Sequence, residues 1–146
     1  QQHMQCYFVL CTMSTSEKLS ITKCIQVQPK KVKSLGSLGQ EGIRNKEKHG
    51  WVTILIAFSE TPQLFHTRNA FASGGVYEDP ATGAASAAYA GYLRDIGWPH
   101  QGRIEINQGF DMGHPSRIVA EIGPEKGSSI RVSGSARVMN ESDFTD

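Results

Sequence analysis

The chain has little net charge and lacks any long hydrophobic run. Its 146 residues include 15 basic and 14 acidic side chains, which leaves a net charge of +1. A charge this small creates no extended field, so neither nucleic acid nor an anionic membrane is an expected partner. The longest apolar run near the start, Cys6–Cys11, is far too short to cross a bilayer and follows no basic segment of a signal peptide.

Cysteine is also scarce. The three cysteines, Cys6, Cys11 and Cys24, all lie in the first 24 residues. Their odd number and their spacing fit neither a disulfide framework nor a Cys-x-x-Cys site. The five histidines are scattered, without a ligand pair such as His-Glu-x-x-His. We therefore expect no metal site and a reduced, cytoplasmic setting.

Short β-branched and apolar segments, separated by glycine and proline, predict a sheet-rich domain. Trp51–Phe58 is apolar almost throughout, as is typical of a strand covered on both faces. The other expected elements are strands at Cys6–Thr12, Ile21–Gln28, Leu64–Arg68, Arg103–Asn107, Arg117–Ile122 and Ile130–Met139, and a short helix around Gln40–Lys48. The length suits one domain. Residues 1–33 form N-terminal strands of uncertain assignment, and residues 34–146 form the main, C-terminal part.

A helix of small residues is expected at Pro80–Ile96, ended by Gly97. Asp79 would be its N-cap, and Pro80 its first residue, since proline loses no hydrogen bond there. The helix is apolar on every side, which predicts that it is buried. Several strands around one buried helix predict an α+β fold, a mostly antiparallel β half-barrel wrapped around one central helix.

The start of this helix is a candidate anion site. Thr82, Gly83 and Ala84 carry small side chains, which leave the first backbone N–H groups and the positive end of the helix dipole open. Ordinary capping by Asp79 and close packing of small residues against strands explain the same pattern, so both interpretations stay open.

Five sequence segments together resemble the C-terminal half of the phenazine-biosynthesis PhzF-like family. The resemblance extends from about Leu64 to Met139, with weaker likeness back to about Ser34. The segments are Arg68–Phe71, Gly74-Gly75, Glu78–Ala88 (EDPATGAASAA), Ile106–Gly109 and Met112–Ser116.

The resemblance implies the diaminopimelate-epimerase fold, in which two half-barrels enclose an active site. It also implies an isomerase that moves a proton on a small carboxylated substrate, without a metal or an organic cofactor. The chain contains sequence for one half, so a second half-barrel is the expected partner, either a missing N-terminal half or another copy in a homodimer. The alternative is a non-catalytic domain that binds a small molecule or an anion.

Within this half, the resemblance assigns the catalytic role to Asp79 and substrate binding to Thr82, Gly83, Ala84, Gly75 and His114. The family's main acid/base glutamate comes from the other half, and no segment of residues 1–60 matches its motif. Ala84 stands where the family usually has serine, so a hydroxyl donor is absent. His114 stands where the family often has arginine, which changes a permanent cation into a mostly neutral group. If that arginine contacts substrate in relatives, a different substrate is expected; if it only supports the turn, little changes.

The other polar residues near the start of this helix are weaker candidates for a functional role. Gln108-Gly109 is expected to end a strand and form a bulge rather than to contact ligand. Arg68 can form an ion pair with Glu78 or contact a ligand, and both remain open. Glu78 and Asp79 are expected to point apart.

Overall fold

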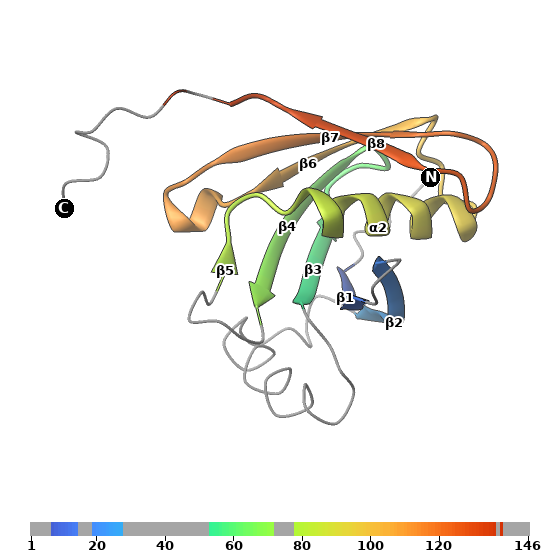
Figure 1. The fold of residues 1–146 in the computed structure, drawn as a ribbon, viewed down its shortest axis with the longest axis horizontal. Helices are drawn as coiled ribbons and strands as arrows, with labels where there is room; N and C mark the ends of the chain where they lie inside the picture. Colours follow the sequence, from blue (N-terminus) through green and yellow to red (C-terminus); the bar gives the residue numbers. More distant parts are fainter. Residues whose placement is uncertain (1–6, 15–18, 28–52, 72–77, 137, 139–146) are drawn as a thin grey trace.

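The computed structural model describes residues 7–14, 19–27, 53–71, 78–136 and 138. Within these ranges the chain has an α+β fold, in which eight strands form one mixed sheet and helix α2 (Gly83–Asp95) packs against it (Figure 1). None of the helices in the described ranges has both the length and the hydrophobicity needed to cross a membrane.

The sheet has the strand order β2-β1-β3-β4-β6-β7-β8, and the short strand β5 pairs with β4 beside it. Among the described pairings only that of β4 with β6 is parallel. A parallel pair needs a crossover connection, and α2 lies between these two strands in the sequence. The strands are β1 Tyr7–Ser14, β2 Leu19–Val27, β3 Thr53–Ser59, β4 Leu64–Phe71, β5 Glu78–Asp79, β6 Arg103–Gln108, β7 Ser116–Ile122 and β8 Ile130–Gly134, with a 3-10 helix η2 at Phe110–Met112.

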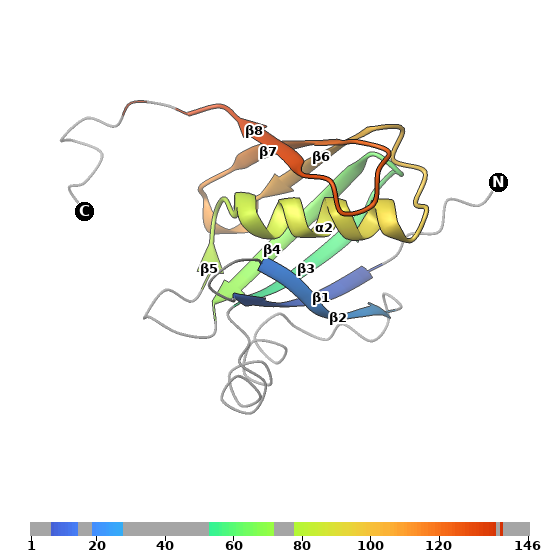
Figure 2. The ribbon, with the colours of Figure 1, turned by 45° about the vertical axis from the view of Figure 1, so that its right-hand side comes forward.

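The sheet curves around the helix. Strands β2 and β8 stand at opposite ends of the strand order, yet both contact α2. Figure 2 shows α2 between β6–β8 above and β1–β2 below, with β3 and β4 behind it. In the described ranges β2 and β8 do not pair with each other, so the sheet stays open.

The core fills the space between α2 and the concave face of the sheet. Phe65 of β4 and Tyr89 of α2 meet edge to face, with ring centroids 5.2 Å apart and planes at 89°, a favourable aromatic geometry. Small residues at Ala85 and Ala90 let the helix approach the strands closely. The remaining members of this buried cluster are Leu55, Ala57, Leu93, Ile104, Ile106, Ile118, Ala120 and Ile122.

The C-terminal end of α2 is set by a glycine. Gly97 adopts a left-handed φ of 71°, and its N–H donates to the carbonyl of Arg94 at 3.0 Å. The N–H of Trp98 donates to the carbonyl of Leu93 at 2.9 Å. These two bonds form a Schellman motif, so the predicted stop at Gly97 is confirmed. Trp98 then packs against the core cluster.

The predicted start of the helix is wrong. Helix α2 begins at Gly83, with Thr82 rather than Asp79 as the N-cap residue. The backbone of Asp79 belongs to β5 and pairs with Asn69 of β4, so this residue is extended and cannot cap the helix directly. The two-residue strand β5 was not predicted.

The other predicted strands are confirmed within three residues at each end, except for the end of the last strand. Thr53–Ala57 is buried at every position, as expected of a strand covered on both faces. Strand β8 ends at Gly134, earlier than the expected Met139. The expected helix around Gln40–Lys48 and the candidate residue Gly75 lie outside the described residues.

Because one face of α2 is buried, the same alanine-to-leucine substitution should change the free energy of unfolding differently at two positions of the helix. Ala90 is fully buried, whereas Ala84 is exposed. Ala90→Leu should lower the free energy of unfolding by about 1–3 kcal/mol because extra methylene groups overpack the core. Ala84→Leu should change it by less than about 0.5 kcal/mol. Urea denaturation measures both, and equal losses would contradict the burial of this face of α2.

Candidate functional site

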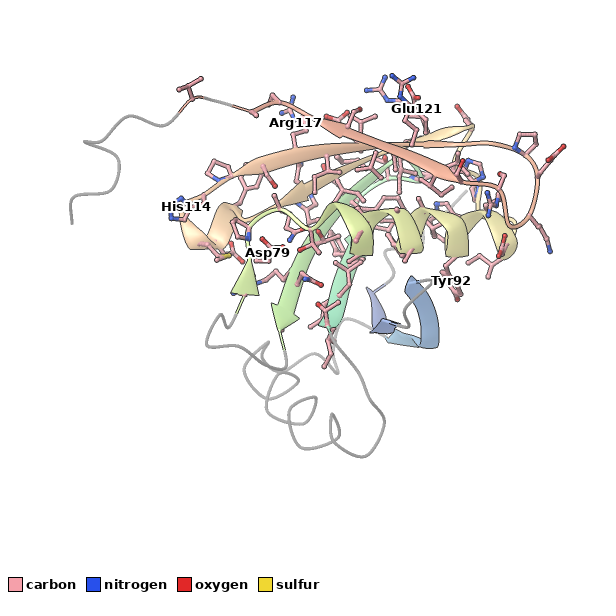
Figure 3. The ribbon with its side chains drawn as sticks, viewed as in Figure 1. Asp79, Tyr92, His114, Arg117 and Glu121 are labelled. Atoms are coloured by element: carbon pink, nitrogen blue, oxygen red, sulfur yellow. The ribbon has the colours of Figure 1, made fainter. Side chains whose placement is uncertain are left out.

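The turn from Asp79 to Thr82, which leads into α2, is held by the Asp79 carboxylate. The Thr82 hydroxyl donates to Asp79 Oδ2 at 2.6 Å, and the Ala81 N–H donates to Asp79 Oδ1 at 3.2 Å. Each carboxylate oxygen therefore receives one hydrogen bond from the turn and keeps further lone-pair capacity for another donor. The carboxylate lies at the N-terminal end of α2 (Figure 3), where the helix dipole favours negative charge.

Gln108, the last residue of β6, connects this turn to the sheet through hydrogen bonds. Its side chain is 1% exposed, and its Nε2 donates to the Asp79 carbonyl at 2.6 Å and to Thr82 Oγ1 at 3.0 Å. Its Oε1 accepts from the Thr82 N–H at 3.4 Å and from the Thr67 hydroxyl at 3.3 Å. Because Thr82 Oγ1 accepts from Gln108, its own proton is directed toward Asp79.

The first backbone N–H groups of α2 have no acceptor within the helix. The first helical bond runs from the Ser86 N–H to the Thr82 carbonyl at 3.0 Å, so the N–H groups of Gly83, Ala84 and Ala85 precede the helical ladder. Thr82 makes no side-chain capping bond, and its hydroxyl points to Asp79 instead. Ala85 is buried, whereas Gly83 is half-buried and Ala84 is exposed. N–H groups at the positive end of a helix dipole can receive an anionic group.

The turn after β6 fits closely against the Asp79–Thr82 turn. Gly109 has a left-handed φ of 76°, and a Cβ there would lie 2.3 Å from the His114 carbonyl oxygen and 2.8 Å from that of Pro80. The Ser116 hydroxyl donates to the Pro80 carbonyl at 2.7 Å. The predicted strand end at Gln108 is confirmed. The predicted bulge is wrong, since Gly109 starts the 3-10 helix η2 and the β6–β7 register is regular.

Adjacent residues of β5 point to opposite faces of the sheet. The Glu78 carboxylate pairs with the Arg68 guanidinium through two bonds of 2.8 Å and 2.6 Å, whereas Asp79 faces Thr82. The hydrogen bonds from Arg68 to Glu78 raise the pKa of Arg68 above its usual value. The expectation that Glu78 and Asp79 point apart is confirmed, and Arg68 forms the ion pair rather than standing free for a ligand.

Four of the predicted site residues lie at the helix mouth, which we define as residues 79–85. Asp79 is half-buried, Thr82 is buried, Gly83 is half-buried and Ala84 is exposed. His114 lies on the turn between β6 and β7, at the same end of α2 as Asp79 (Figure 3), with an exposed side chain. Its backbone carbonyl adjoins Gly109.

The local sequence pattern predicts a strand end at Gln108 and gives no role to Thr67, although both belong to the polar network around Asp79 and Thr82. The alternation of β6 does indicate that Gln108 is buried. Ile104 and Ile106 are buried, so Gln108, two residues further, falls on the same face, and a buried amide must find hydrogen-bond partners.

The tight fit at Gly109 predicts that alanine is much less tolerated there than at a similar glycine nearby. Gly113 also has a left-handed φ, of 73°, but a Cβ there would meet nothing within 4 Å. Gly113→Ala should cost about 1–2 kcal/mol of stability through backbone strain alone. Gly109→Ala should cost about 1–3 kcal/mol more because its Cβ overlaps two carbonyl oxygens. Urea denaturation of the two variants tests this, and equal costs would contradict the packing of the two turns.

Comparisons with known proteins agree with the motif. The family model of phenazine biosynthesis-like proteins (PhzC-PhzF) matches residues 16–142. An uncharacterized isomerase of Mesorhizobium japonicum is 42% identical over 76 residues, which cover 49% of this chain and 25% of that protein. The trans-2,3-dihydro-3-hydroxyanthranilate isomerase of Pseudomonas aeruginosa is 41% identical over 70 residues, which cover 46% of this chain and 25% of that protein.

The matched segment is thus about a quarter of the length of each of these curated relatives. No solved structure gave a significant match. The family model nevertheless covers most of the sequence. The chain belongs to the phenazine biosynthesis-like (PhzC-PhzF) protein family.

Proposed function

We propose that the chain forms one half of the active site of a cofactor-independent isomerase, which moves a proton on a small carboxylated substrate. The observation that carries this proposal is the Asp79 carboxylate, fixed at 2.6 Å by the Thr82 hydroxyl, beside the open N–H groups of α2. In this proposal the N–H groups receive the substrate carboxylate, and Asp79 contacts the group that gains or loses a proton.

The proposed fold is the diaminopimelate-epimerase-like half-barrel. An open sheet that curves around one central helix supports it, because both ends of the strand order reach α2. In this proposal a second half-barrel faces the helix mouth, either as further sequence of the same protein or as another copy of the chain. Its acid/base glutamate would stand opposite Asp79 and complete a site that excludes water.

Names of relatives support the reaction class. Both similar proteins described above are named isomerases, and the one from Pseudomonas aeruginosa is named for a substrate with a carboxylate, a hydroxyanthranilate. The substrate of this chain is proposed only as a small carboxylic acid. Ala84 lacks the hydroxyl that the family usually has at this position, and one neutral hydrogen bond contributes about 0.5–1.5 kcal/mol. A shifted substrate preference is therefore part of the proposal.

The alternative function is binding of a small anion without catalysis. Ala84 favours it, because the hydroxyl donor that the family usually has at this position is absent. The two functions differ in one property: an isomerase exchanges a substrate proton with solvent, whereas a binding domain does not.

Deuterium incorporation from heavy water distinguishes these functions. The 146-residue chain alone should exchange almost nothing on a panel of small cyclic and amino carboxylic acids, because it lacks the proposed glutamate. Exchange should appear when the missing half is supplied, by extension of the reading frame upstream of Gln1 or as the remaining part of the Mesorhizobium relative. Asp79→Asn should then lower the rate by about 100-fold or more, as loss of an acid/base group does.

Asp95→Asn is the matched control, since Asp95 is exposed at the other end of α2, and it should leave the rate unchanged. Mass spectrometry of the substrate measures the exchange. Rapid exchange by the isolated chain that Asp79→Asn abolishes would show that this half carries its own base. Binding of a carboxylate by the completed protein without any exchange would contradict the isomerase and support the alternative.

A further inference from the structure

The face of the sheet opposite α2 holds a cavity that is separate from the helix mouth. Its volume is about 280 Å³, and Ile56, Phe58 and Phe110 supply its apolar walls. His66, Arg68 and Glu78 also line it. These three side chains alternate along β4 and β5 with Phe65, Asn69 and Asp79, which belong to the helix-facing side of the sheet. A molecule in this cavity would therefore not occupy the helix mouth.

The charged groups of this cavity leave an excess of negative charge. Among the described residues that line it, two carboxylates, Glu78 and Asp111, face one guanidinium, that of Arg68. The Arg68 guanidinium is already bound by Glu78 through two short bonds. Its contact with Asp111 is long, at 3.4 Å, and the Asp111 side chain is 71% exposed. The Asp111 carboxylate is thus open to another donor.

His66, which also lines the cavity, does not remove its excess of negative charge. His66 Nε2 lies 2.5 Å from Glu60 Oε2. With a protonated imidazole this pair is neutral, and with a neutral imidazole it adds one more negative charge. The cavity carries at least one negative charge in either case.

The backbone of β6 places a further acceptor in the wall. Asn107 lines the cavity, and its Oδ1 is buried without a hydrogen-bond partner among the described residues. A buried acceptor without a partner is costly, and a small rotation of the amide toward a donor removes that cost. The cavity therefore combines a negative net charge with one unpaired acceptor in its wall.

We propose that this cavity is a binding site for a small amine, an ammonium group carried on an apolar or aromatic body. The ammonium supplies three N–H donors and a positive charge, which Asp111 and the Asn107 amide can accept. The apolar body packs against Ile56, Phe58 and Phe110. A cavity of about 280 Å³ holds one ring with a short side arm. The site is independent of the proposed isomerase.

Three ligands with the same phenylethyl body test the proposal: 2-phenylethylamine, 2-phenylethanol and 3-phenylpropanoate. They are titrated into the 146-residue chain and followed by NMR at the Ile56 methyl groups, the Asn107 side-chain amide, and the backbone amides of Gly83 and Ala84. The amine should bind roughly threefold to tenfold more tightly than the alcohol in low salt, as expected for an exposed charge pair. The carboxylate should bind most weakly. High salt should narrow these differences.

Two variants in the cavity and one control variant outside it test which side chains bind the ligands. Asp111→Asn should reduce the advantage of the amine over the alcohol, and Phe110→Ala should weaken both ligands. Phe110 and Asp111 are exposed, so both variants should fold. Glu121→Gln removes an equal charge from β7, where Glu121 pairs with Arg131 and does not line the cavity (Figure 3). It should leave the binding unchanged.

Several outcomes would overturn the proposal. These are equal affinity for all three ligands, tightest binding of the carboxylate, and an amine preference that Asp111→Asn does not alter. Shifts confined to Gly83 and Ala84 would place the amine at the helix mouth and also reject the second site.

Discussion

The hydrogen bonds of the Gln108 side chain set the geometry on which the rest of the helix mouth depends. A single buried amide binds the Asp79 carbonyl, the Thr82 hydroxyl, the Thr82 N–H and the Thr67 hydroxyl. It thereby joins the sheet to the start of α2 and directs the Thr82 proton to the Asp79 carboxylate. A half-satisfied buried network costs more than an apolar core, so these residues act as a unit. With its hydroxyl turned toward Asp79, Thr82 makes no side-chain capping bond to the first N–H groups of α2.

The two faces of the sheet carry separate chemistry because a strand alternates its side chains. Glu78 and Asp79 are neighbours in the sequence, yet one pairs with Arg68 and the other with Thr82. The face toward α2 presents the Asp79 carboxylate next to the first N–H groups of the helix, and the proposed substrate site uses these backbone donors. The opposite face combines a negative net charge with apolar side chains, and the proposed amine site uses both. One short strand, β5, therefore borders two different environments.

Much of the fold could be predicted from local patterns, whereas the helix start could not. Alternation and β-branched runs predicted the described strands except β5, and Gly97 predicted the end of α2, because both signals act over a few residues. The start was predicted three residues too early, since an Asp-Pro pair is compatible with capping. The backbone pairing of Asp79 with Asn69 prevents Asp79 from capping the helix. This pairing joins two strands, so the residues around the Asp-Pro pair do not predict it. Asp79, Thr82 and Gly83 were proposed as site residues from the helix pattern and the family resemblance. Gln108, which donates to the Asp79 carbonyl and to Thr82, lies more than twenty positions further along the chain.

Coupling between Thr82 and Gln108 is the most direct test of this account. Thr82→Val and Gln108→Met remove the two sides of their contact while preserving volume, and urea denaturation of both single variants and the double variant gives the interaction energy. Residues in one hydrogen-bond network couple by about 0.5–3 kcal/mol, whereas distant residues add within about 0.5 kcal/mol. Thr82→Val combined with Ile130→Val, at the far end of β8, serves as the additive control. The account predicts coupling of about 1 kcal/mol or more between Thr82 and Gln108. Simple additivity of the two substitutions would contradict it.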